Sequence, residues 1–142
     1  MEVVVFRPEH FDMLNEQDVT QVLREYTSPD HAEKLAGCKY AFTGVEEGRV
    51  LICAGLVEYW KDRAVAWAVV DTNCKPHFWK IHKAVKRFLE VAPYRRIEAE
   101  VDVDFEAGHR WAEMLGFTLE APLMRAYHPN GRDCSLYAKV RD

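Results

Sequence analysis

Apolar and acidic residues alternate along residues 97–104, and this pattern predicts a β-strand with two different faces. The two sets of alternating residues are Ile97, Ala99, Val101 and Val103, and Glu98, Glu100, Asp102 and Asp104. Successive side chains of a strand point to opposite sides, so one set is expected in the core. The other set would place four carboxylates in a row on the opposite face.

Six further runs of apolar or alternating residues predict strands, at 3–6, 39–45, 49–59, 64–71, 118–127 and 134–141. The run at 64–71 is almost continuously apolar, which is typical of a central strand covered on both faces. Polar turns at 46–48 and 128–133 predict hairpins between the runs that flank them.

Helical spacing of apolar residues fills most of the remaining chain. Helices are expected at 8–15, after a cap at Asp18 or Thr20, at 31–36, from Pro76 to Pro93, and at 106–115 before Gly116. The order is β-α-α-β-β-β-α-β-α-β-β. The strand, helix and strand between residues 64 and 104 form a crossover, which requires parallel strands. We therefore predict one α/β domain over residues 1–142, with a mixed, mostly antiparallel sheet of seven strands.

Composition and charge exclude several classes of protein. Hydrophobic residues make up 49% of the chain and charged residues 30%, which is typical of a globular protein. The net charge of −4 argues against nucleic acid as a partner and permits a cationic one. No apolar run approaches the roughly 20 residues of a membrane span, and the N-terminus has no signal-peptide pattern, so we expect a cytoplasmic protein. Four scattered cysteines are expected to be reduced thiols, and no histidine spacing suggests a metal site.

The order of elements over essentially the whole chain resembles the GCN5-related N-acetyltransferase (GNAT) superfamily. The segment Trp111–Phe117, with its Leu-Gly-Phe ending, is similar to the helix that leads into the sixth strand of that family. The tail, Met124–Tyr127 with Gly131–Asp133 and Leu136–Val140, resembles short acetyltransferase-like proteins of podovirus-type tailed phages, which are associated with the virion. The resemblance implies acetyl-CoA as cofactor and a small amine or a protein amine as acceptor.

The loop that binds the cofactor pyrophosphate in that family departs from its pattern here. By resemblance it falls on Lys75, His77, Phe78, Trp79 and Lys80. Phe78 and Lys80 occupy the positions of glycines that let backbone N–H groups approach the phosphates. The phenyl ring is expected to block that approach, and Pro76 removes a donor.

A second departure concerns the general acid. The family often places a tyrosine about four residues before the Gly-Phe pair, to protonate the departing thiolate. Ala112 stands there, beside Trp111, and alanine has no proton to give.

The acidic row is the other candidate for chemistry. If it faces a cleft where two strands splay, burial and mutual repulsion would raise a carboxyl pKa, and Glu100 or Asp102 would act as general base toward an amine. The alternative is a solvated or ion-paired face without catalytic work.

Two functions therefore remain open from the sequence. The first is an acetyl-CoA-dependent N-acetyltransferase with a degenerate pyrophosphate loop, working through Glu100 or Asp102. The second is a non-catalytic protein of the same fold that works in a phage virion, or on a host protein, by protein contact.

Overall fold

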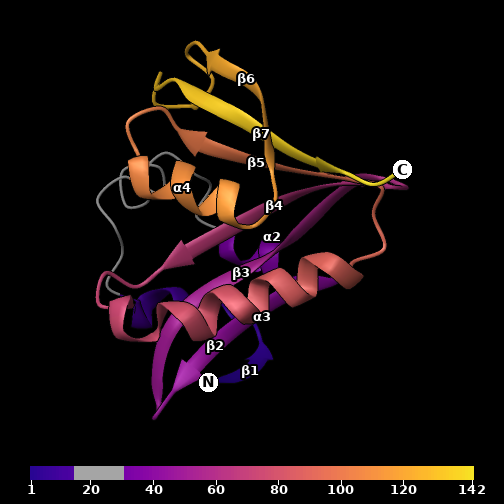
Figure 1. The fold of residues 1–142 in the computed structure, drawn as a ribbon. Helices are drawn as coiled ribbons and strands as arrows, with labels where there is room; N and C mark the ends of the chain where they lie inside the picture. Colours follow the sequence, from indigo (N-terminus) through magenta and orange to yellow (C-terminus); the bar gives the residue numbers. More distant parts are fainter. Residues whose placement is uncertain (15–30) are drawn as a thin grey trace.

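A computed structural model describes residues 1–14 and 31–142 of the chain (Figure 1). The helix predicted after Asp18 or Thr20 lies outside these residues. Seven strands form one sheet in the order β1-β2-β3-β4-β5-β7-β6. They are β1 (Glu2–Val5), β2 (Tyr40–Glu46), β3 (Arg49–Trp60), β4 (Arg63–Val70), β5 (Arg96–Asp102), β6 (Thr118–Met124) and β7 (Cys134–Val140). The predicted mixed α/β fold is confirmed.

The sheet is antiparallel except at its centre, where β4 and β5 run parallel. The crossover between them carries the 3-10 helix η2 (Lys75–His77) and the helix α3 (Phe78–Val91). Parallel neighbours need such a crossover, and a helix is the usual one. β4 is the central strand, as its apolar run predicts.

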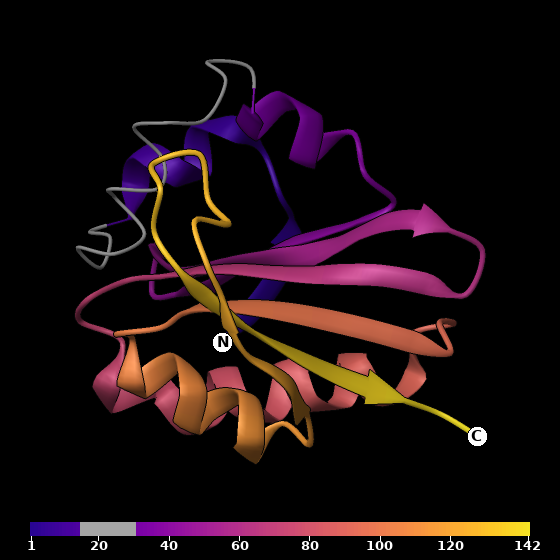
Figure 2. The same ribbon diagram turned by 90° about the horizontal axis from the view of Figure 1, so that it is seen from above.

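Helices cover both faces of the sheet (Figure 2). α3 and α4 (Glu106–Met114) lie on one face, while the 3-10 helix η1 (Pro8–Met13) and α2 (His31–Ala36) lie on the other. The predicted helix at 8–15 is thus a shorter 3-10 turn. Its C-cap residue, Leu14, is extended, so the helical backbone ends at Met13.

The alternation along β5 sorts its residues between two environments. Ile97, Ala99 and Val101 belong to the core cluster beneath α3 and α4, together with Leu89 and Tyr137. The acidic residues therefore face the side of η1 and α2. β5 ends at Asp102, two residues earlier than predicted, because the Asp102 carboxylate accepts the N–H of Asp104 at 3.0 Å and turns the chain.

Candidate functional site

The sheet divides at its centre. The parallel pairing of β4 with β5 runs from Arg63 opposite Arg96 to Ala66 opposite Ala99 and then ends. Beyond it, β4 stays paired with β3 as far as Val70, and β5 stays paired with β7 as far as Asp102. The two halves of the sheet separate there (Figure 1). Beyond Ala66 and Ala99, the backbone groups that β4 and β5 turn toward each other have no partner in the β4–β5 ladder.

The first carboxylate of the acidic row is buried in an ion-pair cluster on the paired side of the fork. Glu98 is 4% exposed and accepts bonds from Arg63 Nε at 2.5 Å, Arg63 Nη2 at 3.0 Å and Arg96 Nε at 2.7 Å. The bond from Arg63, with a further one from Arg96, holds the pKa of Glu98 below its ordinary value although burial opposes this. Glu98 is therefore an anion that stabilises the sheet.

The third carboxylate binds the connection between β6 and β7. Asp102 is 4% exposed, and its oxygens accept Arg132 Nε at 2.5 Å and Nη2 at 2.8 Å. The exposed Asp104 accepts the same Nη2 at 3.2 Å. Arg132 lowers the pKa of Asp102. The sequence argument expected a raised carboxyl pKa in this row, and at Glu98 and Asp102 the direction is the opposite, because arginines from distant parts of the chain reach both residues.

Glu100 has a different environment from its neighbours in the row. It follows Ala99, the last residue of β5 that pairs with β4, so it lies where the fork begins. Its carboxylate accepts the phenolic O–H of Tyr127 at 2.8 Å. Glu100 forms no ion pair with any residue of 1–14 or 31–142. The bond to Glu100, with burial, raises the pKa of Tyr127, which stays a neutral phenol.

Tyr127 is held in place by the turn that carries it. Ala126, at φ 50°, donates its N–H to the Asp133 carboxylate at 2.7 Å, and Tyr127 donates its own N–H to the Arg132 carbonyl at 3.1 Å. The predicted hairpin between β6 and β7 could have pointed to this contact. Because β7 pairs with β5, the turn between β6 and β7 lies close to the acidic row. Tyr127 was not among the site residues predicted from the sequence.

In the loop between β4 and α3, several backbone N–H groups donate hydrogen bonds to carbonyl groups of the same loop. Cys74 N–H donates to Asp71 O at 3.2 Å, His77 N–H to Cys74 O at 2.8 Å, and Phe78 N–H to Lys75 O. Proline at position 76 contributes no donor. The buried Asp71 carboxylate at the start of the loop accepts the N–H of Asn73 at 3.0 Å. This loop therefore offers a phosphate fewer free N–H groups than an open glycine turn. Its Asp71 carboxylate pairs with Arg49 at 3.4 Å.

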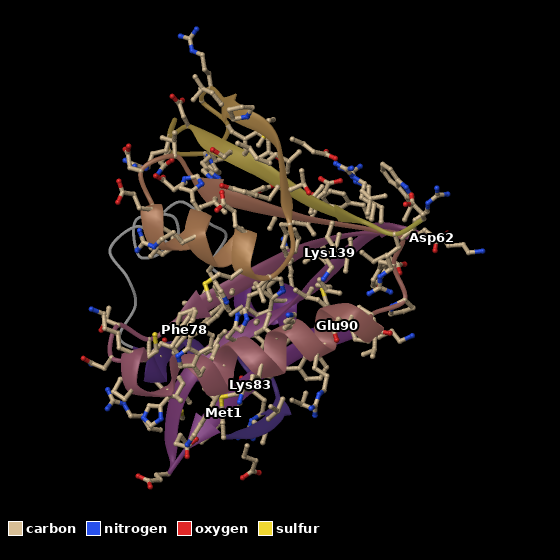
Figure 3. All side chains as sticks on the ribbon, in the orientation of Figure 1. Met1, Asp62, Phe78, Lys83, Glu90 and Lys139 are labelled. Carbon is tan, nitrogen blue, oxygen red and sulfur yellow. The ribbon has the colours of Figure 1, made fainter. Side chains whose placement is uncertain are left out.

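The side chains assigned to the cofactor loop spread in several directions. Phe78 stands at the start of α3 (Figure 3). Its ring stacks on His82 at 5.9 Å and meets Trp111 of α4 edge-on, also at 5.9 Å. Trp111 Nε1 donates to His82 Nδ1 at 3.1 Å, and these aromatic residues join α3 to α4. Trp79, by contrast, is 63% exposed.

Three charged or titratable residues of the same loop remain near its surface. Lys80 binds Glu46 at 3.0 Å. Lys75 is exposed and His77 half-buried, and in the described part of the chain neither forms an ion pair. Lys75 is thus the cation available to an anionic ligand here.

The position of the family's general acid lies in the core. Ala112 is buried with Leu115 and Phe117 in the core cluster, and its neighbour Trp111 packs against the same cluster. At this point of α4 the side chain is therefore an alanine methyl group, which cannot donate a proton.

The described residues lack two further features. They contain no group of three or more metal-ligating side chains that could hold an ion. None of the helices seen in residues 1–14 and 31–142 has the length and apolar character of a membrane span.

No protein-family model matches the chain, and no curated protein matches it in sequence. Solved structures match its fold over nearly the whole length. Ard1 from Thermoplasma volcanium has a TM-score of 0.78 at 14% identity, with 98% of this chain and 96% of that chain covered. A GNAT-family acetyltransferase from Bacillus anthracis has a TM-score of 0.69 at 14% identity, covering 97% and 93%. Aminoglycoside 6′-acetyltransferase type Ii has a TM-score of 0.69 at 16% identity, covering 99% and 97%. The chain therefore has the fold of the GNAT acetyltransferases.

Proposed function

We propose that this chain is an N-acyltransferase that moves an acetyl group from acetyl-CoA to a cationic amine, with Glu100 as general base. The observation that carries the proposal is the place of Glu100 and the contacts around it. It is a carboxyl group with no ion-pair partner among the described residues, at the point where the central strands separate, in a fold shared with acetyltransferases. An anion so placed attracts an ammonium group and can then take its proton.

The residues present fit one part of acetyl-CoA better than another. The fork between β4 and β5 offers unpaired backbone groups to an extended arm with amides. In the loop before α3, the N–H groups of His77 and Phe78 already bond to carbonyl groups of the loop. Binding of a pyrophosphate there would therefore depend chiefly on the Lys75 charge and the α3 dipole. When bound, acetyl-CoA supplies a thioester carbonyl carbon as electrophile.

The chain's own residues then act on the amine. Glu100 attracts the acceptor ammonium and removes its proton, directly or through one water, which frees the nitrogen lone pair. Transfer forms a C–N bond and breaks the C–S bond. The nitrogen then loses a second proton to solvent, and the thiolate that leaves takes a proton from solvent. Tyr127 holds one Glu100 oxygen and leaves the other for the substrate. Asp102, the second residue expected as base, positions Tyr127 through Arg132.

The acceptor is proposed to be a small polyamine or a lysine-bearing protein segment. The acidic row and the net charge of −4 favour a cation, and one solved neighbour is an aminoglycoside acetyltransferase. The test is release of free thiol from acetyl-CoA with spermidine, an aminoglycoside, a lysine peptide and a neutral alcohol as acceptors. Turnover with at least one amine and none with the alcohol is expected. No turnover with any amine at millimolar acetyl-CoA refutes the proposal.

A second candidate is a non-catalytic protein that acts in a phage virion by protein contact. Three observations favour it: the N–H groups of the loop before α3 bond within the loop, Ala112 is buried, and Trp79 is exposed. Calorimetric titration with CoA separates the two candidates. Heat from the native chain favours the enzyme. No heat from the native chain favours the non-catalytic protein, whose partner is then sought by pull-down.

A further inference from the structure

A second feature of the surface lies at the other end of the sheet from the mouth of the fork. An open pocket of about 300 Å³ is lined by the β3–β4 turn from Trp60 to Arg63, by Arg95 and Arg96 before and in β5, and by Val140 of β7. Figure 3 shows Asp62 at this end, where β4, β5 and β7 converge, and Phe78 at the opposite end. The pocket is therefore separate from the acyl-transfer site and does not depend on the proposed function.

The pocket concentrates positive charge in an acidic protein. Four of its lining residues are cations, namely Lys61, Arg63, Arg95 and Arg96, and one is acidic, while the whole chain carries −4. Arg63 and Arg96 bind Glu98, and Arg96 also binds Glu120 at 2.6 Å.

The other two cations are uncompensated. Neither Lys61 nor Arg95 forms an ion pair with any residue in the described ranges. Arg95 donates its Nε to the Arg141 carbonyl at 3.2 Å, so its terminal nitrogens stay available. An ammonium and a guanidinium beside one pocket are the usual donors for a carboxylate or a phosphate.

The pocket also has a flat apolar wall. Trp60 is 60% exposed, and Val140, also in the lining, is 51% exposed. The Arg63 guanidinium lies 4.5 Å from the Trp60 ring and 4.7 Å from the Tyr59 ring, and its bonds to Glu98 fix it there. This stacking holds the indole in one orientation, and an exposed aromatic face next to cations suits a planar ligand.

We propose that this pocket binds a small organic anion, in which a single aromatic ring stacks on Trp60 and a carboxylate or phosphate group binds Lys61 and Arg95. A volume of 300 Å³ lies at the lower end of the range for ligand pockets, which limits the ligand to about one ring with its anionic group. The ring distinguishes this ligand from a free inorganic ion.

The experiment is a titration followed by backbone amide NMR, with phenyl phosphate, benzoate, inorganic phosphate and phenol as separate probes. Phenyl phosphate or benzoate is expected to shift the resonances of residues 60–63, 95 and 96 with a Kd below 1 mM. Inorganic phosphate and phenol are each expected to bind at least tenfold more weakly. The variant Lys61→Ala/Arg95→Ala is expected to lose at least tenfold in affinity, and Trp60→Ala about as much.

The matched control is Lys83→Ala/Lys86→Ala, which removes two exposed cations from α3 outside the pocket. It is expected to leave the affinity unchanged. Equal loss in both double variants, equal binding of inorganic and phenyl phosphate, or no shift at residues 60–63 with any probe would overturn the proposal.

Discussion

Asp102→Asn tests whether the buried part of the acidic row holds the β6–β7 turn. The change keeps the size of the side chain and removes its charge. Asp102 Oδ1 accepts both Asp104 N–H and Arg132 Nη2, and Oδ2 accepts Arg132 Nε. An asparagine can keep the acceptor but sets its NH₂ group against the guanidinium, so one charged bond is lost and two donors meet.

The expected cost follows from the burial of the two partners. Breaking a fully buried ion pair costs about 3–5 kcal/mol. Asp102 is 4% exposed, but Arg132 reaches the surface and can turn its guanidinium toward water, which reduces that figure. We therefore expect a loss of about 2–3 kcal/mol, nearer the range for a hydrogen bond to a charged group. For a chain of this length that corresponds to a fall in Tm of about 5–10 °C.

Asp104→Asn is the matched control, because Asp104 binds the same arginine at 3.2 Å but its side chain is 78% exposed. An exposed pair is worth at most about 1 kcal/mol. Urea unfolding followed by tryptophan fluorescence measures both variants at neutral pH. Equal losses for the two variants, or a loss below 1 kcal/mol for Asp102→Asn, would refute the argument from burial.

Three further predictions concern stability. In Gly55→Ala the new Cβ would lie 2.1 Å from the Tyr40 carbonyl oxygen, so β2 and β3 must separate, and we expect a loss of about 3 kcal/mol in urea unfolding. The lowered pKa of Glu98 adds stability above its unfolded value of about 4.3, which is lost as the pH falls through the folded value; Glu98→Gln should flatten the acid limb of a plot of stability against pH. In Trp111→Phe the buried Nδ1 of His82 loses its donor, at an expected cost of about 1–3 kcal/mol by thermal unfolding.

Each of the three has a result that contradicts it. Gly37→Ala, whose Cβ meets nothing closer than 3.5 Å, is the control for the first, and equal losses would exclude a steric cause. An unchanged acid limb in Glu98→Gln would place the acid sensitivity elsewhere. Trp111→Phe with unaltered stability would mean that water replaces the indole donor at His82.

Much of the fold could be predicted because local patterns determine it. Alternation gave β5 its two faces, and the continuous apolar run gave β4 its central place. The crossover between them requires parallel strands, and the structure has them. These features depend on residues close together in the chain, where period and turn chemistry are visible.

The state of the acidic row could not be predicted, since it depends on residues far along the chain. Arg63 is 35 positions from Glu98, and Arg132 is 30 positions from Asp102. The sequence pattern of alternating carboxylates is the same whether or not arginines pair with them in the folded protein. The difference between Glu100 and its neighbours appears only when the fork and the β6–β7 turn are placed around it.

The direction of Phe78 is a second feature that the sequence leaves open. A phenylalanine at a glycine position was expected to obstruct the loop. In the structure its ring packs between α3 and α4, and several N–H groups of the loop are bonded to carbonyl groups of the same loop.

The central claim is that Glu100 is the base of an acyl transfer, and one comparison of rates tests it most directly. Thiol release from acetyl-CoA, with the best amine acceptor, is measured for the native chain, Glu100→Gln and Glu113→Gln, an exposed control on α4. We predict that Glu100→Gln lowers kcat/KM by about 10²–10⁴-fold without lowering Tm, while Glu113→Gln changes neither. A Glu100→Gln variant that transfers acetyl groups as fast as the native chain would contradict the account.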